Sequence, residues 1–170
     1  NVLNFIPSTQ HSFIINLDIE NQNADIITSG IREAIAQANL EQSVLYFPYG
    51  YYRINDYLHF NRIIVHGNHS IIYKDFNGVG IFTTGGAKYT EIYNLTLEGY
   101  GVGRAIGSDT DVNEHGICVF NNRVKLINVK SYYNRGHGFM LACYSDFSEY
   151  TSTYPFLPPY TGNMNKVVLD

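Results

Sequence analysis

The sequence has no tryptophan, only two cysteines and few charges: 15% of its 170 residues are Asp, Glu, Lys or Arg. Cys118 and Cys143 are too few for a disulfide framework, and we expect free thiols because the two fall out of register on neighbouring repeats. The 11 Lys and Arg residues are scattered along a chain of net charge -4, which argues against a nucleic-acid partner. No apolar run approaches the roughly 18 residues that span a bilayer, so no membrane insertion is expected.

Apolar and aromatic residues are what the chain has in quantity. Apolar types make up 45% of the residues, which excludes a disordered chain, and there are 15 Tyr and 10 Phe. A tyrosine ring can stack on a flat apolar face while its hydroxyl still forms a hydrogen bond. Such residues suit a sugar-binding surface or a subunit interface, and they equally suit packing in a core.

One segment has helical spacing, and nearly all the others have the spacing of strands. Residues 28–40 predict a short amphipathic helix with Ser29 as its N-cap. The apolar face of this helix holds Ile31, Ala34, Ile35 and Ala38. Residues 13–19 alternate as a strand, and short strands with turns follow the helix to the end of the chain. No second helix is expected, which leaves an antiparallel sandwich or a stacked parallel sheet.

A repeat favours the parallel arrangement. The dipeptide His-Gly begins at His115 and again at His137, 22 positions later, and an apolar run follows it both times. Asn94 aligns with Asn128 in a second repeat. Repeats near 22 residues with short strands and no helix are typical of a parallel β-helix, so we predict an all-β fold of that kind. Ile117 and Phe139 should then lie on adjacent strands, as should Gly116 and Gly138.

A motif near the predicted helix carries a family resemblance. Phe47, Pro48, Gly50, Tyr52 and Ile54 form the pattern F-P-x-G-x-Y-x-I after an amphipathic helix and a strand. In this the chain resembles the opening of the pectate-lyase-superfamily proteins. The resemblance implies a right-handed parallel β-helix with a short N-terminal capping α-helix.

The same resemblance sets the expected domain organisation and biological context. Residues 1–27 would be a lead-in segment with a strand, and residues 28–170 the N-terminal part of a longer β-helix. Within this superfamily the Tyr-rich, acidic character is most similar to phage tailspikes and capsule depolymerases. That similarity implies a homotrimer, on a virion or extracellular, that binds and cleaves bacterial surface polysaccharide.

A long loop, residues 98–116, offers the candidate catalytic residues. Sugar cleavage needs a proton donor together with a base or nucleophile, and a lyase needs a base beside a uronic acid, often with a cation. We predict Asp111 and Glu114 as acid and base and Asp109 as a positioning residue. A Gly-rich acidic loop also serves as a solvated connection, and that alternative stays open. No cofactor or metal is predicted, apart from a calcium ion if the reaction is a lyase reaction.

Two histidines are predicted beside that loop. His115 and His137 should stack, and they should be uncharged at neutral pH because stacked imidazoles disfavour double protonation. The repeat also has a structural explanation, since Gly116 and Gly138 would let the backbone bend into the next strand. The remaining residues predicted to bind sugar are Arg135 and, in the loop 143–165, Tyr144, Asp146 and Glu149.

Two classes of function follow from these features. The first is a polysaccharide depolymerase, either a glycoside hydrolase or a polysaccharide lyase. The second is a non-catalytic sugar-binding adhesin or a structural fibre segment. An enzyme would shorten the polymer, whereas an adhesin would bind it and leave its length unchanged.

Overall fold

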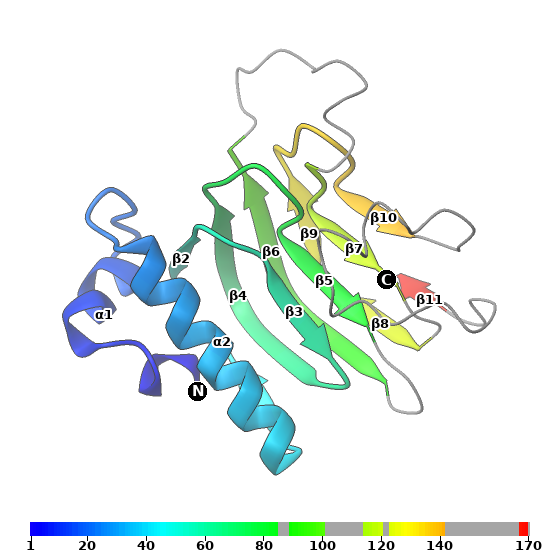
Figure 1. Cartoon of the computed structure of the whole chain (residues 1–170), viewed down its shortest axis with the longest axis horizontal. Coiled ribbons are helices and arrows are strands. Elements are labelled where there is room, and N and C mark those ends of the chain that lie inside the picture. Colours follow the sequence, from blue (N-terminus) through cyan, green and yellow to red (C-terminus); the bar gives the residue numbers. More distant parts are fainter. Residues whose placement is uncertain (85–88, 101–113, 121–122, 142–166, 170) are drawn as a thin grey trace.

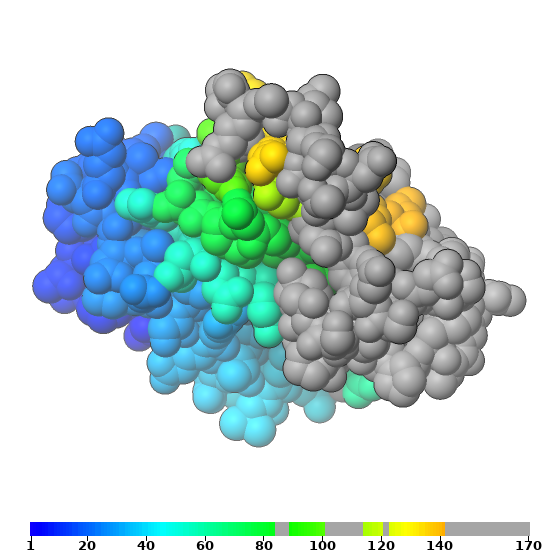
Figure 2. Space-filling view, turned by 45° about the horizontal axis from the view of Figure 1, so that its top comes forward, coloured from blue at the N-terminus to red at the C-terminus, as the bar shows by residue number. Residues whose placement is uncertain are grey.

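The computed structural model of the protein describes residues 1–84, 89–100, 114–120, 123–141 and 167–169. The described chain begins with helices and continues with parallel strands (Figure 1). Its helical elements are η1 (Val2–Asn4), α1 (Ser8–Ile15) and α2 (Ala24–Glu41). Figure 2 shows these helices, in blue, and the first strands, in cyan and green, forming one continuous surface.

The described strands form two sheets, and within each sheet all paired strands are parallel. Sheet A has the order β1-β4-β6-β8-β11, with β2 also paired to β4 and β9 to β6. Its strands are β1 (Val44–Tyr46), β2 (Tyr51–Ile54), β4 (Ile64–Lys74), β6 (Thr90–Gly99), β8 (Val124–Ile127), β9 (Lys130–Tyr132) and β11 (Val167–Leu169). Sheet B has the order β10-β7-β5-β3, and its strands are β3 (Leu58–Asn61), β5 (Ile81–Thr84), β7 (Ile117–Val119) and β10 (Phe139–Leu141).

The predicted fold class is wrong. An all-β right-handed parallel β-helix was expected, but the structure is mixed α/β, with two helices and two parallel sheets in the described residues. The difference arises at the N-terminus, where helix forms from residue 8 to 15 and again from 24 to 41. Helix α2 packs against β1, β2 and β3, and α1 contacts β2, so the helices cover one end of the sheets (Figure 1).

The local prediction for α2 is largely confirmed. Its predicted apolar face is buried, with Ile31, Ala34, Ile35 and Ala38 between 0% and 6% exposed. The helix begins earlier than expected, however, because the Asn23 side chain, rather than Ser29, accepts the N-cap hydrogen bond from the Ile26 N–H.

The strand predicted over residues 13–19 is wrong, because the first part of this segment belongs to α1. Alternation would bury the odd-numbered positions, yet Ile14 is fully buried while Ile15 and Leu17 are 50% and 42% exposed. Pro7 stands at the N-cap of α1, and its fixed φ suits the start of a helix.

The register predicted from the repeats is confirmed. Ile117 pairs with Phe139 in parallel strands β7 and β10, and the Gly116 N–H donates to the His137 carbonyl at 2.9 Å. Asn94 and Asn128 both have left-handed backbone conformations, with φ of 52° and 51°. The Asn128 amide donates to the Asn94 side-chain oxygen at 2.8 Å, so the two form a ladder.

The F-P-x-G-x-Y-x-I motif joins the helices to the sheets. The rings of Phe47 and Tyr52 are fully buried and meet edge to face, with centroids 5.3 Å apart. The Tyr52 hydroxyl donates to the Pro48 carbonyl at 2.7 Å. A Cβ on Gly50 would lie 2.7 Å from the Ile14 side chain, so only glycine allows α1 to approach this closely. The motif therefore has a packing role.

Candidate functional site

The candidate site lies where three chain segments enter sheet B one above another. Gly80, Gly116 and Gly138 lead into β5, β7 and β10, respectively. Backbone hydrogen bonds of 2.9 Å, from Ile81 N–H to the Gly116 carbonyl and from Ile117 N–H to the Gly138 carbonyl, hold the segments in register. Residues before these glycines are therefore stacked at the amino-terminal edge of sheet B.

The histidine ladder predicted from the sequence is present. The rings of His115 and His137 are stacked with centroids 5.1 Å apart and planes 8° apart. His115 is buried, at 4% exposure, and His137 is exposed. The stack therefore runs from the interior toward solvent.

The protonation of His115 follows from its contacts. Its Nδ1 accepts a hydrogen bond of 2.9 Å from the His137 backbone N–H, so a neutral ring carries its proton on Nε2. Burial, together with the neighbouring His137 and Lys74, lowers the pKa of His115 to about 4. At neutral pH His115 is uncharged and can donate from Nε2.

Glu114 is the carboxylate of the site, and only one of its two carboxylate oxygens has a hydrogen-bond partner among the described residues. Its Oε1 accepts from Arg135 Nη1 at 3.2 Å, with the two side chains 9% and 20% exposed, respectively. Its Oε2 is buried and has no hydrogen-bond partner among the described residues. The Gly136 N–H donates to the Glu114 carbonyl at 3.0 Å, which fixes the backbone of Glu114 relative to Arg135.

Lys74 lies beneath these groups at the end of β4. It is 1% exposed, and its Nζ donates to the Gly78 carbonyl at 2.5 Å and to the His115 carbonyl at 3.5 Å. Burial lowers the pKa of Lys74 to about 8, and the carboxylate of Glu114 opposes that shift. A buried cation thus faces a buried carboxylate.

Sequence reasoning missed Lys74, although a signal was present. Ser70, Ile72 and Lys74 share one face of β4 by alternation, and all three are buried. A lysine on the inward face of a strand is rare unless it is paired, so its position alone marks an unusual polar group.

The structure brings together four of the nine predicted site residues: Glu114, His115, Arg135 and His137. The other five lie outside the described residues: Asp109, Asp111, Tyr144, Asp146 and Glu149. No group of three or more His, Cys, Asp or Glu side chains in the described part of the chain is arranged to hold a metal ion. Cys118 is a free, buried cysteine in β7, and burial raises the pKa of its thiol.

No protein-family model, curated protein or solved structure matched this chain when it was compared with them. None of the helices in the described ranges is long and apolar enough to cross a membrane.

Proposed function

We propose that this protein binds and cleaves polysaccharide, with Glu114 as the residue that transfers the proton. The observation that carries the proposal is the buried Oε2 of Glu114, which has no partner among the described residues while Oε1 is paired with Arg135. A buried polar atom without a partner is costly, and a catalytic role is one of the explanations for such an atom in a folded protein. A reacting water is a donor small enough to satisfy this buried oxygen.

The groups around Glu114 suit a sugar. His115 offers an Nε2–H donor, the Arg135 guanidinium offers planar donors, and the His137 ring presents a flat face that is exposed. As a base, Glu114 would take a proton from the attacking water in hydrolysis, or from the carbon beside a uronic carboxylate in elimination. In either reaction Asp111, the acid predicted from the sequence, would give a proton to the leaving glycosidic oxygen. Bacterial surface polysaccharide is the substrate class implied by the similarity of the Tyr-rich, acidic chain to phage tailspikes and capsule depolymerases.

The test is to incubate the protein with purified capsular and O-antigen polysaccharides from a panel of bacteria. Polymer length is followed by size-exclusion chromatography, new reducing ends by a colorimetric assay, and unsaturated products by ultraviolet absorbance. Hydrolysis gives reducing ends alone, whereas a lyase also gives the absorbing product. Glu114→Gln should lower cleavage about a hundredfold or more and leave binding intact, because the amide keeps the shape of the side chain but cannot accept a proton.

Glu98→Gln is the matched control. Glu98 is a half-buried carboxylate on β6 that accepts a hydrogen bond of 2.7 Å from the Tyr51 hydroxyl, and its amide variant should cleave at the wild-type rate. Cleavage by Glu114→Gln at the wild-type rate would refute the role of Glu114. Binding of a polysaccharide with no change in its length would identify the protein as an adhesin and not an enzyme. The lack of any binding would refute both functions.

A further inference from the structure

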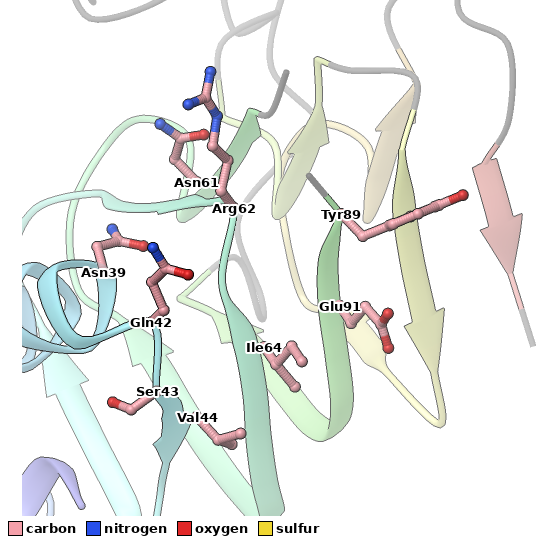
Figure 3. A pocket seen from close by; sticks show the side chains of 9 residues that line it. All are labelled: Asn39, Gln42, Ser43, Val44, Asn61, Arg62, Ile64, Tyr89 and Glu91. Atoms are coloured by element: carbon pink, nitrogen blue, oxygen red, sulfur yellow. The ribbon is translucent and has the colours of Figure 1, made fainter. Parts of the chain in front are cut away.

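A second site lies at the opposite end of β4 from Lys74. A groove of about 710 Å³ opens there between the end of α2, the start of β4 and the start of β6 (Figure 3). Because β4 runs from Ile64 to Lys74, this groove and the site around Glu114 lie at its opposite ends, ten positions apart. The two sites therefore use different side chains of the same strand.

The floor of the groove is aliphatic and open to solvent. Val44, Ile64 and Glu91 are direct neighbours across the parallel strands β1, β4 and β6. Val44 and Ile64 are 47% and 38% exposed, whereas Leu45 and Val65, the next residues along each strand, are buried in the core. Two branched apolar side chains thus form a small flat surface on the outer face of sheet A.

Planar polar groups surround this floor. Asn39 and Gln42 lie on one side, at the end of α2 (Figure 3). Asn61, the last residue of β3, and Arg62, which follows it, lie above the floor. Their carboxamides offer both donors and acceptors, and the guanidinium offers a fork of donors. On the opposite side Glu91 presents a carboxylate, which also accepts a hydrogen bond from the Tyr93 hydroxyl.

Arg62 is held in place by its backbone. It has a left-handed conformation, with φ of 55°, and its N–H donates to the Thr90 hydroxyl at 2.9 Å. No residue in the described ranges forms an ion pair with its guanidinium. Tyr89 adds an aromatic side chain at the rim. The residue is 53% exposed, and the Arg123 guanidinium lies 5.7 Å from the centroid of its ring.

We infer that this groove binds a pyranose unit of an oligosaccharide. A pyranose ring has one face of C–H groups, which matches the floor of Val44 and Ile64, and a rim of hydroxyls, which matches the amides. A guanidinium on one side and a carboxylate on the other can each bind two adjacent hydroxyls, Arg62 as a double donor and Glu91 as a double acceptor. Sugar binding in this groove needs no chemistry at Glu114 and is therefore separate from the proposed cleavage.

The test measures the binding of short oligosaccharides to the full chain by saturation-transfer NMR and by titration of backbone amide chemical shifts. The sugars are oligomers of glucose, galactose, N-acetylglucosamine and galacturonate. At least one sugar should bind, with shift changes at Ile64 and Glu91. Arg62→Ala and Asn39→Ala should each weaken binding about tenfold. Both positions are exposed, and alanine at Arg62 keeps the Cβ, so the fold should be retained.

Lys130→Ala, which removes an exposed charge on β9, should bind as the wild type does. Glu114→Gln should also keep binding in the groove, so loss of the groove and loss of cleavage can be told apart. Three results would each overturn the inference. They are failure of every sugar to bind, chemical-shift changes confined to residues outside the groove, and an affinity of Arg62→Ala equal to that of the wild type. Binding of an unstructured peptide in place of the sugars would identify the groove as a protein-docking site instead.

Discussion

His115 should make the stability of the fold depend on pH in the weakly acidic range. Its pKa is lowered from 6.5 to about 4 in the folded chain, first by burial and then by His137 and Lys74. Between these two values the unfolded chain binds a proton that the folded chain does not bind. The free energy of unfolding must therefore fall as the pH is lowered through this window.

The size of the effect follows from the two pKa values. Integrating the difference in bound protons from pH 7 to pH 5 gives a loss of about 2 kcal/mol from this one side chain. The variant His115→Asn removes the titrating group, and its side-chain oxygen can still accept the hydrogen bond from the His137 N–H. Its unfolding free energy should thus change about 2 kcal/mol less than that of the wild type over the same interval.

The measurement is urea unfolding followed by circular dichroism at pH 7 and pH 5, on the wild type, His115→Asn and the control His69→Asn. His69 is exposed in the left-handed conformation, which asparagine tolerates, so this control should keep the wild-type pH dependence. His59, whose pKa burial also lowers to about 4, contributes equally to all three proteins and cancels in the comparison. An identical pH dependence in the wild type and His115→Asn, or an NMR titration that places the pKa of His115 near 6.5, would refute the buried, neutral imidazole.

Two further predictions test how the fold is held together. Ile35→Asp places a charge against the sheet at a position that is 6% exposed, and it should lower the unfolding free energy by roughly 3 kcal/mol or more, or prevent soluble expression. Leu40→Asp on the same helix, at 79% exposure, should change the unfolding free energy little. Equal stability of the two variants would contradict the packing of α2. Gly67→Ala would put a Cβ against the Asn94 carbonyl oxygen, closer than van der Waals contact allows, and should lower the unfolding free energy by roughly 1–3 kcal/mol. Asn68→Gly, next to it at φ of 46°, should be tolerated. Thermal melts that place Gly67→Ala at the wild-type midpoint would show that β4 and β6 are not in close contact there.

The sequence predicted local register better than it predicted architecture. Spacing identified the buried face of α2, and the repeated His-Gly dipeptide identified the stacking of β7 on β10. Both signals are periodicities that can be read directly from the sequence. The class of fold failed on residues 8–15, where an apolar run of three residues, Phe13 to Ile15, fits a strand or a helix equally well by periodicity. Burial of Ile14 against the chain near Gly50 decides for the helix, and that contact cannot be read from the local pattern.

The site shows the same division. The pairing of His115 with His137 was available from the repeat, since parallel register places equivalent positions one above another. The pairing of Glu114 with Arg135 has the related separation of 21 positions, but only the structure shows which oxygen is used. Lys74 comes from a different part of the chain, 40 positions before Glu114, and no repeat connects them.

The strongest reason to regard the Glu114 cluster as more than a structural ion pair is a comparison within the same molecule. Asp56 pairs with Arg32 at 2.7 Å, and its second oxygen accepts the Tyr57 N–H at 2.8 Å, so both carboxylate oxygens are used although the side chain is 49% exposed. Glu114 is far more buried, where an unpaired oxygen costs more, yet its Oε2 has no partner in the described chain. A carboxylate that served only to neutralise Arg135 and Lys74 would stabilise the fold more with both oxygens hydrogen-bonded. This buried, unpaired oxygen is therefore the atom at which a bound water should be sought first.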